Sequence, residues 1–381
     1  MFEPRPAYHP AAHAEPARRV VDPWLLVSAL ALTGIGLVMV FSSSSAIAEK
    51  RYLDAAHFVK HQFGHLAAGL VVMTFLATRD HRDLGKWSLP LIIGVFVALV
   101  LVLIPGLGHR AGGAARWLRL GWFSLQPAEL AKLALVLYLA RFLALRQNEV
   151  TSLLRAFLPA LGVALALTLP VLAEPDLGMS LTLMTLALTM LFVAGARPVH
   201  LAGLVLASLP ALYLLVALFS YRLKRLWAFL DPWADPNDSG FQIIHSFMAL
   251  GSGGLSGAGL GGSMQKLFYL PEPHTDFILS VLGEELGLMG ILGVLGLFMV
   301  LIWRGLRAAL ACRDAFGSLL ALGCTLIIGL QAFVNAGVVM GLLPTKGLTL
   351  PFISYGGSSL IVNLACVGIL MSVAAARERA S

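Results

Sequence analysis

Charged residues are scarce in this chain of 381 residues. Only 12% of them are Asp, Glu, Lys or Arg, whereas 58% are hydrophobic. An ordinary soluble domain carries about 25% charged residues. A soluble enzyme of this length is therefore excluded, because so few charges cannot cover its surface in water. Disorder is excluded for the same reason, except in the first twenty residues.

Cysteine is nearly absent as well. The chain has three, of which Cys324 and Cys366 fall in apolar runs and Cys312 in a short loop that contains arginine. This pattern indicates neither a disulfide framework nor a cysteine metal cluster. The net charge of +7 reflects Lys and Arg at membrane interfaces, and it does not indicate a nucleic-acid partner.

Familiar motifs of soluble enzymes are missing too. The sequence contains no P-loop lysine motif, no HExxH and no GxSxG. One GxGxxG match occurs at Gly257–Gly262, but no predicted strand precedes it. We therefore interpret it as a flexible glycine turn and not as a dinucleotide site.

Long apolar runs extend along the whole chain. A transmembrane helix needs about 20 apolar residues, whereas a membrane β-barrel would show short alternating segments. The sequence thus predicts an all-α polytopic membrane protein with ten transmembrane helices. The predicted spans are Trp24–Phe41, His61–Thr78, Trp87–Ile104, Pro127–Leu145, Leu153–Leu172, Leu177–Gly195, Val199–Phe219, Ile278–Trp303, Ala315–Met340 and Gly357–Ala375.

Lys and Arg are more numerous in the loops that would be cytoplasmic if the chain starts in the cytoplasm. We therefore predict that both termini are cytoplasmic (N-in/C-in). We expect a disordered tail at 1–20, one membrane domain at 21–376 and a short tail at 377–381. The connection 220–277 is far longer than the others, and its basic-aromatic stretch Tyr221–Phe229 suits a membrane interface. It predicts a large structured periplasmic loop over the bundle.

Ionisable residues in or beside the spans are candidates for function, because charge is costly at membrane depth. Glu129 and Lys132 are spaced i, i+3 on one helix face, either as a self-neutralising pair or as the polar wall of a cavity. Asp176 follows Glu174 in a tight turn. It caps the next helix or faces a water-filled cavity.

A second group surrounds the eighth and tenth spans. His274 and Asp276 precede the eighth span, where Asp276 suits either a helix cap or a general base. For Glu284 and Glu285, two turns further on, we favour a buried hydrogen-bond network.

Cations and hydroxyls add to this picture. Lys346 and Ser358 lie in a turn rich in Gly and Ser, which either cradles a phosphate or is a plain re-entrant turn. Arg116 adds a cation that either contacts the substrate or snorkels to the interface. These residues fit a phosphate-bearing substrate at the membrane surface and equally an ion-coupled transporter, so by themselves they leave the choice open.

Several long motifs are similar to those of one known family. Tyr269–Phe277 (YLPEPHTDF), Gly283–Gly287 (GEELG) and Leu343–Ser359 (LPTKGLTLPFISYGGSS) carry the resemblance, and Gln126–Glu129 and Glu174–Gly178 match further blocks. In this order and over residues 20–376, the chain resembles the SEDS family (shape, elongation, division and sporulation proteins). It is more similar to the FtsW branch of that family than to the RodA branch.

The resemblance implies a peptidoglycan glycosyltransferase that polymerises lipid II during septal cell-wall synthesis in the bacterial inner membrane. Asp276 falls on the essential aspartate of the family, as a general base or a metal ligand, and a lipid pyrophosphate leaves. A divalent cation (Mg or Mn) or nearby Lys and Arg would neutralise the pyrophosphate. The expected substrate-binding residues are Arg116, Glu129, Lys132, Asp176, His274, Lys346 and Ser358.

The same resemblance implies partners: the class B penicillin-binding protein FtsI, the division proteins FtsQ, FtsL, FtsB and FtsN, and membrane lipid. Three alternatives stay open on the sequence. A lipid II flippase would line its path with the same polar residues. A solute transporter would carry a midplane site on broken helices. A scaffold would only recruit the transpeptidase.

Overall fold

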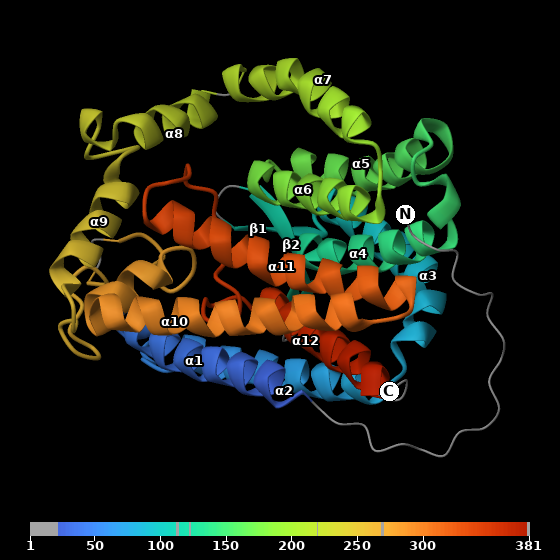
Figure 1. Cartoon of the computed structure of the whole chain (residues 1–381). Helices are drawn as coiled ribbons and strands as arrows, with labels where there is room; N and C mark the ends of the chain where they lie inside the picture. Colours follow the sequence, from blue (N-terminus) through green and yellow to red (C-terminus); the bar gives the residue numbers. More distant parts are fainter. Residues whose placement is uncertain (1–21, 112–113, 122, 219, 268–269, 379–381) are drawn as a thin grey trace.

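The computed structural model describes residues 22–378 except 112–113, 122, 219 and 268–269. All ten predicted segments are helical in it. Their helices are α1 (Pro23–Tyr52), α2 (His57–Thr78), α3 (His81–Leu103), α4 (Pro127–Leu145), α5 (Leu158–Ala173), α6 (Leu177–Ala194), α7 (Pro198–Ala217), α10 (Ile278–Ala311), α11 (Ala315–Val339) and α12 (Gly357–Glu378). In Figure 1, α1, α2, α10, α11 and α12 run along the length of one bundle.

Eight helices in the described residues are long and apolar enough to cross a membrane. The two expected spans outside this set are α2, which carries several histidines and Gln62, and α4, which carries Glu129, Lys132 and Arg141. The structure therefore gives a mostly helical, multi-span protein. The count of ten spans stays a prediction, because polar side chains lower the hydropathy of these two helices.

The beginning of α1 and the end of α12 lie at the same end of the bundle, which we call the terminal end (Figure 1). Asp22 caps α1 and accepts a hydrogen bond from Arg304 Nε near the end of α10 (2.9 Å). Ser372 of α12 donates to the Arg79 carbonyl oxygen after α2 (2.6 Å). The start of α1 and the end of α12 thus lie on one side of the bundle, and which side of the membrane this is stays a prediction.

The all-α prediction is wrong for the segment between α3 and α4. This segment forms a three-stranded antiparallel sheet of β1 (Gly108–Ala111), β2 (Ala114–Leu120) and β3 (Phe123–Leu125), in that order. Gly121 has φ +63° in the β2–β3 turn, a conformation that glycine adopts without strain. Large and polar residues alternate over short stretches of this segment. These stretches are too short for a transmembrane span but long enough for a β-meander.

The long connection before α10 contains two helices, α8 (Ser220–Leu230) and α9 (Phe241–Gly253), with a short 3-10 turn at Pro232–Ala234. Together α7 and α8 form an arch that stands away from α5, α6 and α11 (Figure 1). None of the apolar stretch of α7 is buried within the protein. In contrast, 83% of the α12 span is buried, which makes α12 the centre of the bundle.

Close packing of α12 on α2 depends on small residues. A Cβ at Gly368 would lie 2.4 Å from the Met73 carbonyl oxygen, so only glycine allows this approach. Small residues serve the same purpose in membrane helix pairs generally. At the start of α12, a Cβ at Gly357 would likewise lie 2.1 Å from His65 Cδ2, so the end of the Leu343–Ser359 motif also packs closely on α2.

Candidate active site

A cavity of about 70 Å³ lies where five segments meet. Its walls come from α8, α9, the residues that lead into α10, α11 and the loop before α12. The lining residues are Arg225, Gln242, Asp276, Phe277, Asn335, Val338, Thr345, Gly347 and Leu348. Polar residues from all five segments therefore converge on one small space.

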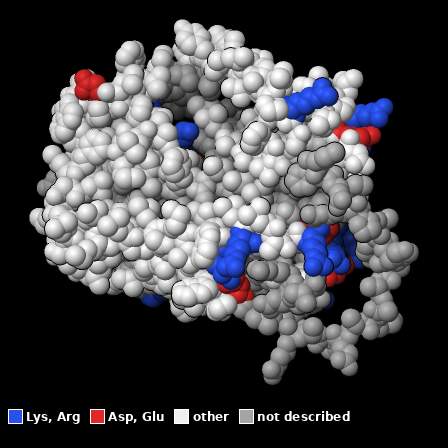
Figure 2. Space-filling model, in the orientation of Figure 1, with Lys and Arg blue, Asp and Glu red and all other residues white. Residues whose placement is uncertain are grey.

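The surface around this region is largely uncharged. In Figure 2 most of the visible face is white, and its charged side chains gather mainly toward the side where α1 begins and α12 ends. A hollow with a basic side chain inside opens under the α7–α8 arch. An uncharged face of this kind suits contact with lipid. The hollow is an opening in this face that contains a basic side chain.

Asp276 lies two residues before α10 and is half-buried in the cavity wall. It is not the helix cap, because the capping position of α10 is Phe277 and no side chain bonds there. The Asp276 carboxylate lies against Gly347, where a Cβ would be 3.3 Å from Oδ2. The carboxylate therefore does not cap α10. It faces the loop that forms the opposite wall of the cavity.

The pKa of Asp276 is raised to about 6, mainly by burial and also by the negative charge of Glu272, while Arg225 opposes the rise. Asp176 and Arg116 act on the same carboxyl with smaller and opposite effects. A carboxylate with a pKa near the working pH is well suited to accept a proton in a reaction. The charges around the cavity therefore tune the group that the sequence singled out.

Arg116 and Asp176 form the nearest charged pair outside the cavity, with Arg116 Nε 3.5 Å from Asp176 Oδ2. Arg116 also donates to the carbonyl oxygens of Glu174 (3.3 Å) and Pro175 (3.0 Å). Asp176 caps α6 by accepting from the Met179 amide (3.0 Å). The prediction that Asp176 caps a helix is confirmed. Arg116 is held by its contacts with the turn at Glu174–Asp176 and does not extend freely to the membrane interface.

Glu174 is 1% exposed, and within the described residues neither of its carboxyl oxygens has a hydrogen-bond partner. The pKa of Glu174 is raised to about 8, mainly by burial and also by the negative charge of Asp176, while Arg116 opposes the rise. Glu174 therefore holds a proton at neutral pH.

Lys346 lies between two cavity-lining residues, Thr345 and Gly347. Its backbone packs on the start of α6, where a Cβ at Gly178 would lie 3.0 Å from the Lys346 carbonyl oxygen. Burial lowers the pKa of Lys346. Arg225 Nη1 donates to the Thr345 carbonyl oxygen at 3.5 Å and links α8 to the same loop.

Four other predicted site residues also lie outside the cavity lining: Glu129, Lys132, His274 and Ser358. Ser358 accepts from the Gln126 amide (2.9 Å) and joins α12 to the start of α4. Glu129 and Lys132 form a buried ion pair of 2.7 Å, as the self-neutralising alternative predicted.

His274 is 2% exposed and packs between Phe58 and Tyr355, with ring centroids 4.5 and 5.6 Å away. Burial lowers the pKa of His274, so the ring is mostly neutral. Its Nε2 also lies 3.4 Å from Glu272 Oε2, so His274 combines ring packing with one polar contact.

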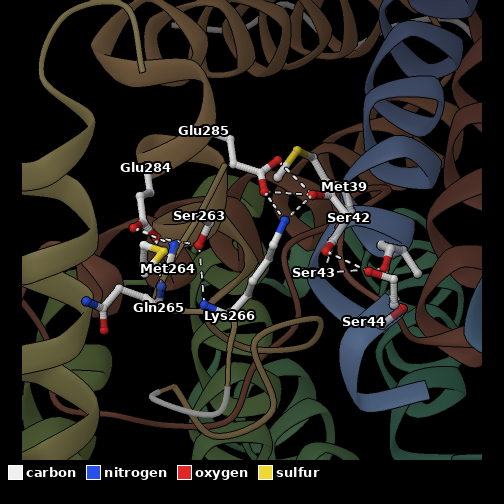
Figure 3. Close-up of polar contacts among 12 residues, drawn as sticks. Met39, Ser42, Ser43, Ser44, Ser263, Met264, Gln265, Lys266, Glu284 and Glu285 are labelled. Carbon is white, nitrogen blue, oxygen red and sulfur yellow. Dashed lines mark hydrogen bonds and ion pairs between the residues drawn. The ribbon is translucent and has the colours of Figure 1, made fainter. Parts of the chain in front are cut away.

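Figure 3 shows a second polar cluster, which we call the Lys266 cluster: Ser42, Ser263, Lys266, Glu284 and Glu285. Lys266 Nζ is 2.7 Å from Glu285 Oε1 and donates to Ser42 Oγ at 3.0 Å. Glu284 accepts from Ser263 Oγ and from the Met264 amide (2.9 Å). The predicted buried network is confirmed, and it holds the segment before Asp276 against α1 and α10.

Sequence reasoning missed several cavity residues, above all Arg225, Gln242 and Asn335. Arg225 belongs to the amphipathic stretch that was assigned only to the membrane interface. Asn335 is a single amide inside an apolar span, and that rarity was the available signal. Their distance in sequence from Asp276 hid their common location.

Comparison with known proteins identifies the family of the chain. Residues 23–379 match the family FTSW_RODA_SPOVE, described as cell cycle protein. The chain belongs to the FtsW/RodA/SpoVE family. The resemblance to SEDS proteins that the motifs indicated is thereby confirmed.

Individual members of the FtsW/RodA/SpoVE family are close in sequence and in structure. The probable peptidoglycan glycosyltransferase FtsW of Geobacter sp. (strain M18) is 48% identical over 355 residues, which are 92% of this chain and 96% of that protein. A chain of a peptidoglycan synthase complex that coordinates polymerization and crosslinking has TM-score 0.77 and 32% identity, covering 94% of this chain and 98% of its own. The Thermus thermophilus rod shape determining protein RodA has TM-score 0.70 and 32% identity, with 95% and 99% covered.

Proposed function

We propose that the protein is a peptidoglycan glycosyltransferase that polymerises lipid II, with Asp276 as the general base or as a ligand of a catalytic metal ion. One observation carries the proposal: a half-buried Asp276 carboxylate with a raised pKa lines the polar cavity of a member of this family. The remaining steps follow from what such a group can do at that place.

The reaction is the transfer of a glycosyl group to a sugar hydroxyl. The Asp276 carboxylate takes the proton of the acceptor hydroxyl as its oxygen forms a bond to C1 of the donor sugar. The bond from C1 to the lipid pyrophosphate breaks, and the pyrophosphate leaves with the electron pair. Pyrophosphate is a good leaving group, so a second carboxyl acid of the glycosidase kind is not required. Attack in one step inverts the anomeric carbon.

Negative charge on the leaving pyrophosphate needs neutralisation. Arg225 lines the cavity, and Arg116 and Lys346 lie on segments beside it. These three cations are the proposed phosphate-binding groups of the chain. Ser358, Glu129, Lys132 and His274 support the site from neighbouring elements.

The cavity residues can accommodate a divalent cation, Mg or Mn, together with the phosphates of the substrate. Asp276 is the carboxylate that the described cavity offers, and Mg²⁺ is commonly held by one or two carboxylates together with substrate phosphates. Asp276 and the pyrophosphate oxygens would hold the ion, which would supply further charge neutralisation when bound. The residues of the chain still position the two sugars and exclude other acceptors.

We propose that a lipid-linked substrate reaches the site beneath the arch of α7 and α8. A polyprenyl tail stays in the bilayer beside the uncharged face, while its sugar headgroup enters the hollow under the arch (Figure 2). We further propose a multi-pass protein of the inner membrane with both termini cytoplasmic, which acts at the division septum. Its partners would be a class B penicillin-binding protein (FtsI) and the division proteins FtsQ, FtsL, FtsB and FtsN.

The decisive experiment is polymerisation of pure lipid II by the purified protein with its cognate transpeptidase, in an assay free of other polymerases. We expect glycan strands with the wild type and none with Asp276→Asn, which keeps the side-chain shape but cannot accept the proton. Asp238→Asn is the matched control, because Asp238 is 70% exposed in the same connection. Transport of lipid II across vesicles without strand formation would favour a flippase, and an active Asp276→Asn protein would refute the proposed role of Asp276.

A further inference from the structure

Asn335 is a polar residue buried near the end of α11, and it lines the cavity together with Asp276. The residue is 2% exposed. Its Nδ2 donates one hydrogen bond to the Asp276 carbonyl oxygen (2.8 Å) and a second to the Leu348 carbonyl oxygen (2.7 Å). Both amide hydrogens are therefore used on two different segments of the cavity wall.

The orientation of this amide is fixed by its partners. Carbonyl oxygens only accept hydrogen bonds, so the nitrogen of the amide must face both of them and a flipped amide would lose both bonds. Within the described residues, Oδ1 of Asn335 has no hydrogen-bond partner. Burying an unpaired oxygen costs free energy. Asn335 therefore serves this position through its two N–H donors, although its unpaired oxygen costs free energy.

The two bonds set the distance between opposite walls. Asp276 leads into α10, whereas Leu348 directly follows Gly347, the residue against which the Asp276 carboxylate lies. One side chain on a third element, α11, thus holds the backbone of the base and the loop that faces it. A change at Asn335 would let these two segments move apart while the Asp276 side chain itself stays unaltered.

We propose that Asn335 is a positioning residue that fixes the Asp276 carboxylate for glycosyl transfer; this inference rests on the proposed function. Proton transfer depends steeply on geometry, and a displacement of about 1 Å at a reacting group can cost about 100-fold in rate. The loss should therefore appear in kcat, whereas KM for lipid II should change little.

The test compares Asn335→Leu, which is similar in size but has no donor, with Gln331→Met as the matched control. Gln331 lies one turn earlier on α11, is 0% exposed, and within the described residues its amide has no hydrogen-bond partner. Gln331→Met thus removes a buried amide from the same helix without releasing either carbonyl. Each variant is measured in the full-length protein with its transpeptidase.

We expect Asn335→Leu to lower kcat about 10- to 100-fold, with KM within about twofold of the wild type. The pH at half-maximal rate should shift as well, since the surroundings of the carboxylate change. Hydrogen exchange should become faster at residues 343–350 in Asn335→Leu and stay unchanged in Gln331→Met. If Asn335→Leu does not fold, Asn335→Ser, which keeps one donor, should lower kcat by less and show the same exchange change.

Two outcomes would overturn the positioning role. One is wild-type kcat and pH profile in Asn335→Leu, and the other is an equal loss in Gln331→Met, which would indicate general damage to α11. The proposed function fails separately, if the wild type makes no strands or if Asp276→Asn stays active. The exchange measurement needs no activity, so it reports on the Asn335 contacts in either case.

Discussion

The ion pair inside α4 leads to the sharpest prediction about stability. Lys132 Nζ is 2.7 Å from Glu129 Oε2, and the two side chains are 0% and 5% exposed. We expect Lys132→Met, which removes the ammonium but keeps most of the side-chain volume, to destabilise the protein strongly. The physical reason is the carboxylate that remains, buried without a counter-ion.

The magnitude follows from the geometry. Two unit charges at 2.7 Å attract each other by about 6 kcal/mol at an effective dielectric constant of about 20. Desolvation of both groups offsets much of this attraction in the intact pair. Removing one partner of a buried pair therefore destabilises a protein by about 3–5 kcal/mol. Removing both charges with shape kept, in Glu129→Gln/Lys132→Met, should restore most of the stability.

The chain offers a matched control in Asp83 and Lys86. This pair has the same i, i+3 spacing and a similar distance, 2.8 Å, but its side chains are 61% and 78% exposed. Exposed pairs contribute little, so Lys86→Met should leave the unfolding transition unchanged. The free energy of unfolding in mixed detergent micelles is the measurement for all three variants.

Two results would refute this reasoning. Lys132→Met could unfold like the wild type, which would mean that water or lipid headgroups solvate Glu129. Alternatively, the double variant could be as unstable as Lys132→Met, which would mean that the lysine stem, and not the charge balance, stabilises α4.

Three further predictions concern the cavity and its surroundings. The polymerisation rate should rise as the pH rises through about 6, because the ionised form of Asp276 accepts the proton; a rate that falls over this range would exclude the base role. The raised pKa of Glu174 means that the folded state keeps a proton that the unfolded state loses, so stability should fall as the pH rises from about 4.5 to about 8. Melting temperatures of Glu174→Gln should show a flatter pH dependence than those of the wild type. Gly347→Ala should slow polymerisation, since φ is +62° there and the new Cβ would lie 3.3 Å from Asp276 Oδ2; Gly64→Ala, with open space around it, is the control and should have wild-type activity.

The sequence by itself determined the class of protein and the family, and it proposed Asp276 as the central residue. Scarce charge and long apolar runs require a helical membrane protein, since every backbone polar group must be satisfied inside the lipid. The motif that ends in Asp276 indicated the family, and the i, i+3 spacing of Glu129 and Lys132 predicted their pairing. These features are local, so they can be read from neighbouring residues alone.

Only the tertiary structure decided which residues share the cavity. Arg225, Asn335 and Gly347 meet Asp276 from separate elements, although about 50 to 70 positions separate each of them from it in the chain. Helix periodicity gives the face of a helix but not the neighbour that the face meets. The small sheet between α3 and α4 was missed for another reason: its strands pair with sequence neighbours but have only 4, 7 and 3 residues, so their alternation is too short to stand out beside the long apolar runs.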